Sequence, residues 1–160
     1  MKKKKILKLS AISFVAILLL IQFIQPNKEN PPVEKEQTID ALLQVPDSVL
    51  TVFKRSCYDC HSNETKWPLY ASIAPVSWLI SHDVTEGRRE LNFSEWGKYK
   101  AKRQLKKLSE IADEIEGNSM PMPIYLPLHP DAKLSDSDRR LIVAWSRSEH
   151  DKMADTSDVK

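Results

Sequence analysis

The N-terminus carries the feature that most constrains the fold, a basic start followed by a long stretch without charge. Lys2–Lys5 and Lys8 precede Leu9–Ile24, which has 16 residues and no charged side chain. A helix of that length is about 24 Å long, and with Lys8 snorkelling, residues 6–24 approach the ~30 Å hydrocarbon core of a bilayer. We therefore expect a single transmembrane helix over residues 1–24, which leaves the rest of the chain for one small domain.

The end of this stretch favours a retained anchor over a cleaved signal. A cleaved signal peptide usually ends in small residues, whereas residues 22–26 read Gln-Phe-Ile-Gln-Pro. No cysteine lies near this point, so lipoprotein processing is excluded. Because flanking lysines stay in the cytoplasm, we expect an inner-membrane protein with its C-terminal domain in the periplasm. The alternative is a signal cut at a poor site, which would give a soluble exported protein.

The charges are distributed unevenly along the chain. Five of the 24 Lys and Arg residues lie in the first 24 positions, which contain no acid, so the rest has 19 basic against 22 acidic side chains. A mildly acidic body argues against nucleic-acid binding, which needs a basic face to displace counterions from phosphates. The three glycines form neither a G-x-G-x-x-G nor a Walker pattern, which argues against a phosphate-binding loop.

Beyond the anchor, the sequence divides into a linker, a domain and a tail. Residues 25–37 are polar, contain proline and show no apolar periodicity, which predicts a flexible linker. Residues 38–150 carry the apolar periodicity of a folded domain. Three helical stripes are expected to face its core, at Val49, Val52, Phe53 and Ser56, at Leu105, Leu108, Ile111, Ala112 and Ile115, and at Leu141, Ile142 and Trp145. Residues 151–160 are predicted to be a frayed polar tail.

The domain is predicted to be all-α, a small cytochrome c-like fold wrapped around one central group. Asp47 is a good N-cap for a first helix that leads into Cys57. Three more helices are predicted, over residues 75–86 with Gly87 as a stop, over 95–116 with Ser94 as cap and Gly117 as stop, and over 135–149 with a Ser135–Asp138 capping box. Four prolines exclude a helix from 118 to 133, and no segment is typical of a strand. The modest apolar content favours a fold that packs around an apolar group.

The only two cysteines stand in the sequence Cys57-Tyr58-Asp59-Cys60-His61. This C-x-x-C-H spacing is the attachment pattern of c-type haem. Two thioethers must reach the two vinyl groups on one edge of the porphyrin, and the next side chain must reach the iron, which neutral imidazole binds well. The motif therefore predicts one haem c, held covalently through Cys57 and Cys60, with His61 as the proximal iron ligand.

The same cysteine pair permits three other interpretations. Cys57 and Cys60 could form a structural disulfide in an oxidising compartment. A thioredoxin-like dithiol needs a βαβ setting that a helical chain lacks. A zinc site needs two further ligands, but there is no second C-x-x-C, and His82, His129 and His150 are scattered. The spacing favours haem over all three.

The sixth iron ligand is less constrained than the proximal one. Met120 lies in the segment SMPMP, residues 119–123, between the last two predicted helices. The flanking prolines reduce the entropy lost in holding a sulfur on iron, so Met120 is the favoured ligand. Met122 follows about 6–7 Å further along an extended chain and is an alternative. His82 and His129 are the other candidates, and a bis-His iron has a lower potential than a His/Met iron.

Two stretches resemble a known family. They are CYDCHSNETKWPLYASIAPVSWLISHDVTEGRRELNFSEW, residues 57–96, and EIEGNSMPMPIYLPLHPDAKLSDSDRRLIVAW, residues 114–145. Both are similar to the bacterial haem-binding domain family, whose members are cytochrome c-like. The resemblance implies covalent haem at Cys57 and Cys60 with His61 as proximal ligand, and it places Met120 at the family's Met-Pro position.

Two classes of function are compatible with these residues. We expect a membrane-anchored cytochrome that transfers electrons with an unidentified redox partner protein, because a six-coordinate iron blocks substrate access. The alternative is a haem-based redox or gas sensor, or a peroxidase-like enzyme, with an open sixth site. A peroxidase site needs a distal His and Arg, for which His82 with Arg88 or Arg89 is the nearest combination. The same arginines are candidates for binding haem propionates. The Met120 segment favours the electron carrier over an enzyme.

Overall fold

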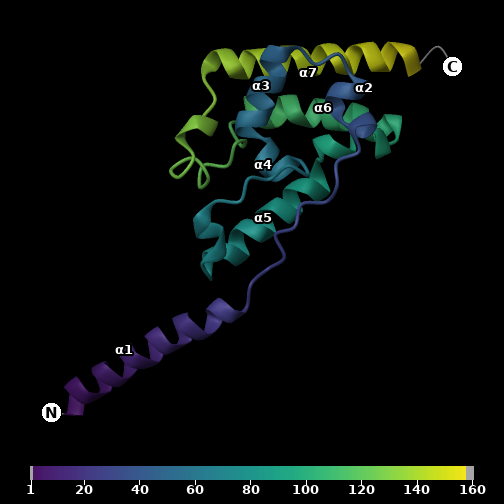
Figure 1. Ribbon diagram of the computed structural model, residues 1–160. Coiled ribbons are helices and arrows are strands. Elements are labelled where there is room, and N and C mark those ends of the chain that lie inside the picture. Colours follow the sequence, from purple (N-terminus) through teal and green to yellow (C-terminus); the bar gives the residue numbers. More distant parts are fainter. Residues whose placement is uncertain (1, 158–160) are drawn as a thin grey trace.

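The computed structural model describes residues 2–157, a long N-terminal helix joined to a helical domain (Figure 1). The α-helices are α1 (Lys2–Leu20), α2 (Ile39–Leu42), α3 (Asp47–Ser56), α4 (Tyr58–His61), α5 (Val76–Glu90), α6 (Ala101–Glu116) and α7 (Asp136–Ser157). Five 3-10 turns join them, η1 (Ile21–Phe23), η2 (Lys35–Gln37), η3 (Leu69–Ser72), η4 (Phe93–Lys98) and η5 (Pro130–Ala132). No strand occurs between residues 2 and 157, which confirms the predicted fold class.

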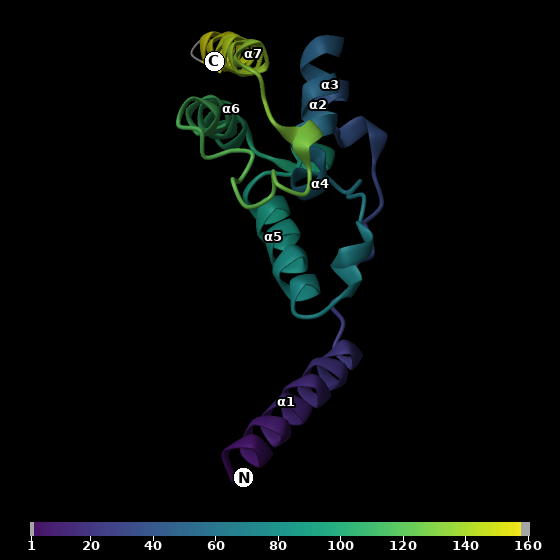
Figure 2. The same ribbon diagram turned by 90° about the vertical axis from the view of Figure 1, so that its left-hand side faces the viewer.

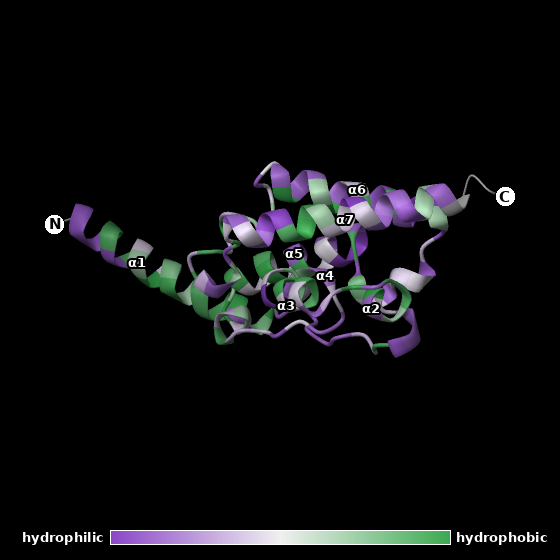
Figure 3. Ribbon diagram, turned by 90° about the horizontal axis from the view of Figure 1, so that it is seen from above, coloured by the Kyte–Doolittle hydropathy of each residue, from purple (hydrophilic) through white to green (hydrophobic). Residues whose placement is uncertain are grey.

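The N-terminal helix projects away from the domain (Figures 1 and 2). Lys3–Phe23 is long and apolar enough to cross a membrane, and none of it is buried inside the protein. Figure 3 shows that apolar residues follow the initial lysines along this helix. Length and composition therefore agree with the predicted transmembrane segment.

Two antiparallel helices, α6 and α7, form one side of the domain (Figures 1 and 2). Arg139 Nη1 donates to the carbonyl of Ile115 at 3.1 Å, and Ser146 Oγ donates to the carbonyl of Leu108 at 2.7 Å. Together these bonds set the register of the pair. The predicted apolar faces of both helices are buried, at Leu108, Ile111, Ala112 and Ile115 in α6 and at Ile142 and Trp145 in α7.

An aromatic cluster joins α3 to this helix pair. The ring of Phe53 stacks on Phe93 with centroids 4.8 Å apart and meets the edge of Trp145 at 5.4 Å. The ring of Tyr58 also stacks on Phe93, with centroids 5.4 Å apart. Because Tyr58 belongs to α4, the cluster fixes the C-x-x-C-H turn directly against the core.

The structure corrects the predicted end of the second helix. Gly87 does not stop α5, which continues to Glu90. A Cβ atom at position 87 would lie 2.6 Å from the carbonyl oxygen of Cys60. Gly87 therefore allows α5 to lie close against α4, a requirement that sequence position alone does not distinguish from a helix stop.

Three other helix boundaries differ from the predictions. Residues 93–98 form η4 rather than the first turns of α6, because Asn92 Oδ1 accepts from the amide of Ser94 at 3.0 Å and starts a separate turn. Asp47 is the first residue of α3 and Pro46 is its N-cap. α7 continues past Glu149 to Ser157, so most of the predicted tail is helical, and residues 158–160 lie outside the described residues. The predicted Ser135–Asp138 capping box is present, with bonds of 2.9 and 3.1 Å.

Residues 25–37, predicted to be a flexible linker, are instead bound along the domain. Lys28 Nζ donates to Ser72 Oγ at 2.6 Å, and Asn30 Nδ2 donates to the carbonyl of Thr65 at 2.9 Å. Further along, Asn63 Nδ2 donates to the carbonyl of Pro32 at 3.2 Å. We call residues 25–37 the strap. Two of these bonds use polar side chains that suggested a solvated linker, and the third uses the carbonyl of Pro32.

Candidate functional site

One turn of helix brings the two cysteines and the histidine together. α3 ends at Ser56, and the amide of its C-cap residue, Cys57, still donates to the carbonyl of Phe53 at 2.8 Å. The carbonyl of Cys57 then accepts from the amides of Cys60 at 3.2 Å and His61 at 2.9 Å, which closes α4. Cys57 is three residues from Cys60 and four from His61, spacings that bring side chains close together on a helix, and all three residues line one cavity.

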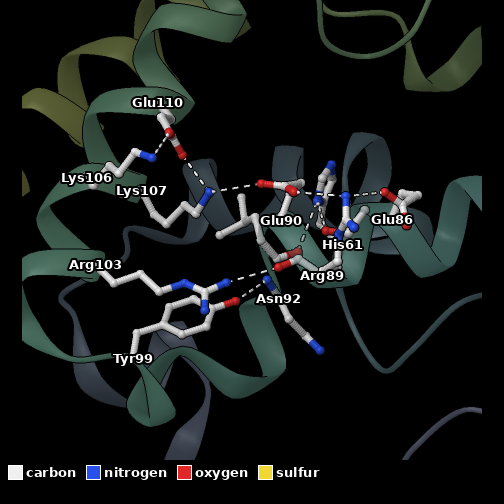
Figure 4. A network of polar contacts seen from close by, with 12 residues as sticks. His61, Glu86, Arg89, Glu90, Asn92, Tyr99, Arg103, Lys106, Lys107 and Glu110 are labelled. Carbon is white, nitrogen blue, oxygen red and sulfur yellow. Dashed lines mark hydrogen bonds and ion pairs between the residues drawn. The ribbon is translucent and has the colours of Figure 1, made fainter.

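The ring of His61 is fixed by the end of α5. Its Nδ1 lies 2.9 Å from the carbonyl oxygen of Gly87 and 3.1 Å from that of Leu91 (Figure 4). Carbonyl oxygens only accept, so Nδ1 carries the proton and Nε2 presents its lone pair. Burial lowers the pKa of the imidazole below its usual value, which keeps the ring neutral. This is the arrangement of a histidine that binds a metal through Nε2, with a carbonyl holding the other nitrogen.

Both cysteines are free, half-buried thiols. Burial raises the pKa of Cys57 to about 12 and that of Cys60 to about 11. A redox-active dithiol needs a lowered thiol pKa, so these values argue against the thioredoxin-like interpretation. Within residues 2–157, no group of three or more His, Cys, Asp or Glu side chains is placed to hold a metal ion, which argues against a zinc site.

Two adjoining cavities share the residues around His61. The first lies against the core, and its lining includes Phe53, Leu91, Phe93, Ile111 and Ile115. The second lies between α5 and the proline-rich segment, and its lining includes Cys60, Gly87, Met122 and Tyr125. Cys57, His61, Glu90 and Met120 line both. The fold therefore brings Met120 to the cavities that hold the C-x-x-C-H residues, although 59 positions separate it from His61.

The other candidate ligands are placed differently. Met122 lines the second cavity but not the first. His82 is exposed on α5 and lines neither. His129 stacks on Tyr125 at 3.8 Å, with Nδ1 3.2 Å from the Tyr125 carbonyl and Nε2 2.9 Å from the Tyr70 hydroxyl. Both nitrogens of His129 are thus bound within the protein.

A family model described as the haem-binding domain matches residues 16–148 of this sequence. The match covers most of the chain, including both cavities and the C-x-x-C-H turn. The chain belongs to this haem-binding domain family. No curated protein and no solved structure matches it.

The residues of this haem-binding domain fit a haem group. The His61 ring offers Nε2 to a metal, because its hydrogen bonds to the Gly87 and Leu91 carbonyls are both made by Nδ1. Two thiols lie within one helical turn beside it, and Met120 offers a thioether at the same cavities. The wall formed by Phe53 and Ile111 is apolar, as a porphyrin face requires.

Lys107 is a site residue that the sequence analysis missed. It lines the first cavity and is buried, with Nζ 2.6 Å from Glu110 Oε2 and 3.6 Å from Glu90 Oε2 (Figure 4). It is the one basic residue in that lining. Its position four residues before Ile111, on the buried stripe of α6, was the available signal, but helical lysines are usually solvated.

The two predicted propionate partners are engaged elsewhere. Arg88 Nε donates to the carbonyl of Ser62 at 2.8 Å, and its Nη2 donates to Thr65 Oγ1 at 2.8 Å and to Asn30 Oδ1 at 2.7 Å. Arg89 pairs with Glu86 and Glu90 at the surface. Arg88 therefore joins three segments, the loop after His61, the strap and α5.

Arg88→Gln is expected to loosen the loop that follows His61. It removes a charged donor from three acceptors, and hydrogen bonds to charged groups contribute about 1.5–3 kcal/mol. Opening that becomes easier by 1.4 kcal/mol speeds amide exchange about tenfold, so hydrogen exchange of residues 62–66 should accelerate by at least about that factor.

Arg89→Gln is the matched control, because the neighbouring arginine contacts only Glu86 and Glu90 by ion pairing at the surface and donates no bond to this loop. In Arg89→Gln, hydrogen exchange of residues 62–66 should be as fast as in the unmodified chain. Equal acceleration by both variants would contradict the bridging role of Arg88.

Proposed function

We propose that this chain is a membrane-anchored, monohaem c-type cytochrome that transfers electrons on the periplasmic side of the membrane. The observation that carries the proposal is the state of His61. Its Nδ1 is held by the Gly87 and Leu91 carbonyls, and His61 lines one cavity together with Cys57, Cys60 and Met120. Haem iron, when bound, supplies one-electron redox chemistry.

Cys57 and Cys60 are proposed to hold the group covalently. When haem is bound, each S–H would add across one of its vinyl groups, with the sulfur bonding to one vinyl carbon and the hydrogen to the other, and with no net change of oxidation state. The spacing of three residues within a helical turn supports this role, because it places both sulfurs on one edge. α5 packs closely against the same turn at Gly87, where a Cβ atom would lie 2.6 Å from the carbonyl oxygen of Cys60.

His61 and Met120 are proposed to hold the haem iron, His61 through Nε2 and Met120 through its thioether sulfur. A neutral imidazole with a fixed Nδ1–H is a good ligand, and the carbonyl bonds also hold the ring orientation. Met120 is the only methionine that lines both cavities at His61 among the described residues. Together with an imidazole ligand, a thioether would give a bound haem iron a higher potential than a second histidine would.

Electron transfer is favoured over peroxidase or sensor chemistry by what lines the cavities. A peroxidase-like site needs a distal histidine and arginine. The linings of the two cavities contain His61 as their one histidine and no arginine. His82 is exposed, and Arg88 is bound to the loop and the strap. These placements supply no distal histidine and arginine pair to the two cavities, and they favour electron transfer to a partner protein over peroxidase chemistry.

The membrane anchor is proposed to be α1. The helix is unburied and apolar, and the lysines before it favour a cytoplasmic N-terminus. Its end is tied to the domain, because Trp78 Nε1 donates to the carbonyl of Ile24 at 2.6 Å. The domain would then sit directly at the membrane surface rather than at the end of a free tether.

Covalent attachment is tested by extracting the haem. In a host with cytochrome c maturation, the exported full chain should keep its haem through acid–acetone extraction, and its intact mass should include one haem. Each single variant, Cys57→Ala or Cys60→Ala, should retain haem through the remaining thioether, whereas the double variant should release all of it. Ser56→Ala, which keeps both thiols, is the matched control and should behave as the unmodified chain.

Release of all haem from the unmodified chain would contradict covalent attachment. So would complete retention by the double variant. A chain that gains no haem during maturation would overturn the proposed function as a whole.

The sixth ligand is tested by replacing Met120. Met120→Ala should abolish the sulfur-to-ferric-iron charge-transfer band in the optical spectrum. The variant should also bind added imidazole at least about tenfold more tightly than the unmodified chain. In the unmodified chain imidazole must first displace Met120, and displacing an internal ligand that contributes 1.4 kcal/mol weakens imidazole binding about tenfold.

Met122→Ala and His82→Ala are the matched controls, and both should leave the band in place. Loss of the band in Met122→Ala, or an unchanged spectrum in Met120→Ala beside an altered one in His82→Ala, would refute Met120 as the ligand.

A further inference from the structure

The domain exposes a group of large apolar side chains on one face. Leu69 of η3 is 94% exposed, and Ile73, Val76 and Leu79 follow it through the start of α5. Ile124 and Leu128, 68% and 64% exposed, belong to the proline-rich segment and line the same cavity as Val76 and Leu79. We call these six residues the apolar patch. A contiguous exposed patch of this kind marks a contact surface.

The apolar patch lies where the N-terminal helix meets the domain. The side chain of Gln22, in η1, donates to the carbonyl of Ala74 at 3.0 Å and accepts from its amide at 2.9 Å. Ala74 stands between Ile73 and Val76 of the patch. Figures 1 and 2 both show the start of α5 and η3 as the part of the domain next to the end of α1, with α7 on the far side.

Two further bonds fix this junction beside the patch. Trp78 Nε1 donates to the carbonyl of Ile24, and Lys28 Nζ reaches the Ala71 carbonyl at 3.3 Å and Ser72 Oγ. The end of the apolar helix is therefore bound to the chain on both sides of Pro75. A domain tied this closely to a transmembrane helix cannot turn its adjoining face away from the membrane.

We propose that the apolar patch rests in the interface of the bilayer that α1 crosses, as a second membrane contact. The bilayer is the expected partner of the apolar patch, because the patch begins at the residues that bind the end of α1. An indole and a lysine beside apolar side chains, here Trp78 and Lys28, are the residue types that settle at the headgroup level. The inference rests on the proposed anchoring by α1.

The test uses the full, haem-loaded chain with one copy in each lipid nanodisc of phosphatidylethanolamine and phosphatidylglycerol. Cysteine is introduced by Leu69→Cys or Leu79→Cys, and the rate of reaction with a membrane-impermeant maleimide is measured. Leu42→Cys is the matched control, because Leu42 and Leu79 are each 49% exposed and Leu42 lies in α2, away from α1.

Positions 69 and 79 should react at least about tenfold more slowly than position 42, because desolvation that raises a thiol pKa by one unit removes about nine-tenths of its thiolate. Attached to photoactivatable maleimide, they should also crosslink to lipid. Equal rates at all three positions, with no lipid adduct, would overturn the proposal. That result would leave a partner protein or a second copy of the chain as the molecule that covers the apolar patch, since a disc with one chain contains neither.

Failure of the proposed function would look different. The chain without an introduced cysteine should not react, because its thiols are held as thioethers. Its reaction would overturn covalent attachment, and failure of the chain to elute with the discs would overturn the anchor. The haem absorbance of each variant reports that its domain is folded.

Discussion

The hydrogen bonds from His61 Nδ1 to the carbonyls of Gly87 and Leu91 are the contacts on which the site depends. They require the end of α5 to lie against the C-x-x-C-H turn, which only a residue without a Cβ permits at position 87. They fix the tautomer of the imidazole and its direction at once. The aromatic cluster at Phe93 holds the same turn from the core, so both sides of the turn are constrained before any group is bound.

Sequence reasoning found the parts of this protein that depend on local pattern. The all-α fold, the buried stripes of α3, α6 and α7, and the Ser135 capping box follow from helical periodicity and end signals. The haem-binding family followed from the C-x-x-C-H spacing and the flanking residues, and the family match over residues 16–148 confirms it. The assignment of Met120 as a ligand is still a prediction, although the fold brings it to the cavities of His61.

What sequence reasoning missed depends on contacts between distant segments. The sequence predicts a helix stop at Gly87, and only the packed structure shows that the carbonyl of Cys60 needs the space. Arg88 was a candidate for binding propionates, but Ser62, Thr65 and Asn30 already take its donors. The strap was predicted to be flexible because its residues are polar, and those polar groups are the ones that bind it to the domain. No local pattern predicts such partners.

The account is tested most directly by proton NMR of the reduced, diamagnetic protein with isotope-labelled histidine. The porphyrin ring current displaces protons above and below its centre strongly upfield. We predict that the His61 ring protons and one methionine methyl are displaced in this way, with a slowly exchanging proton on His61 Nδ1. His61 ring protons at ordinary shifts, or a rapidly exchanging Nδ1 proton, would contradict the account.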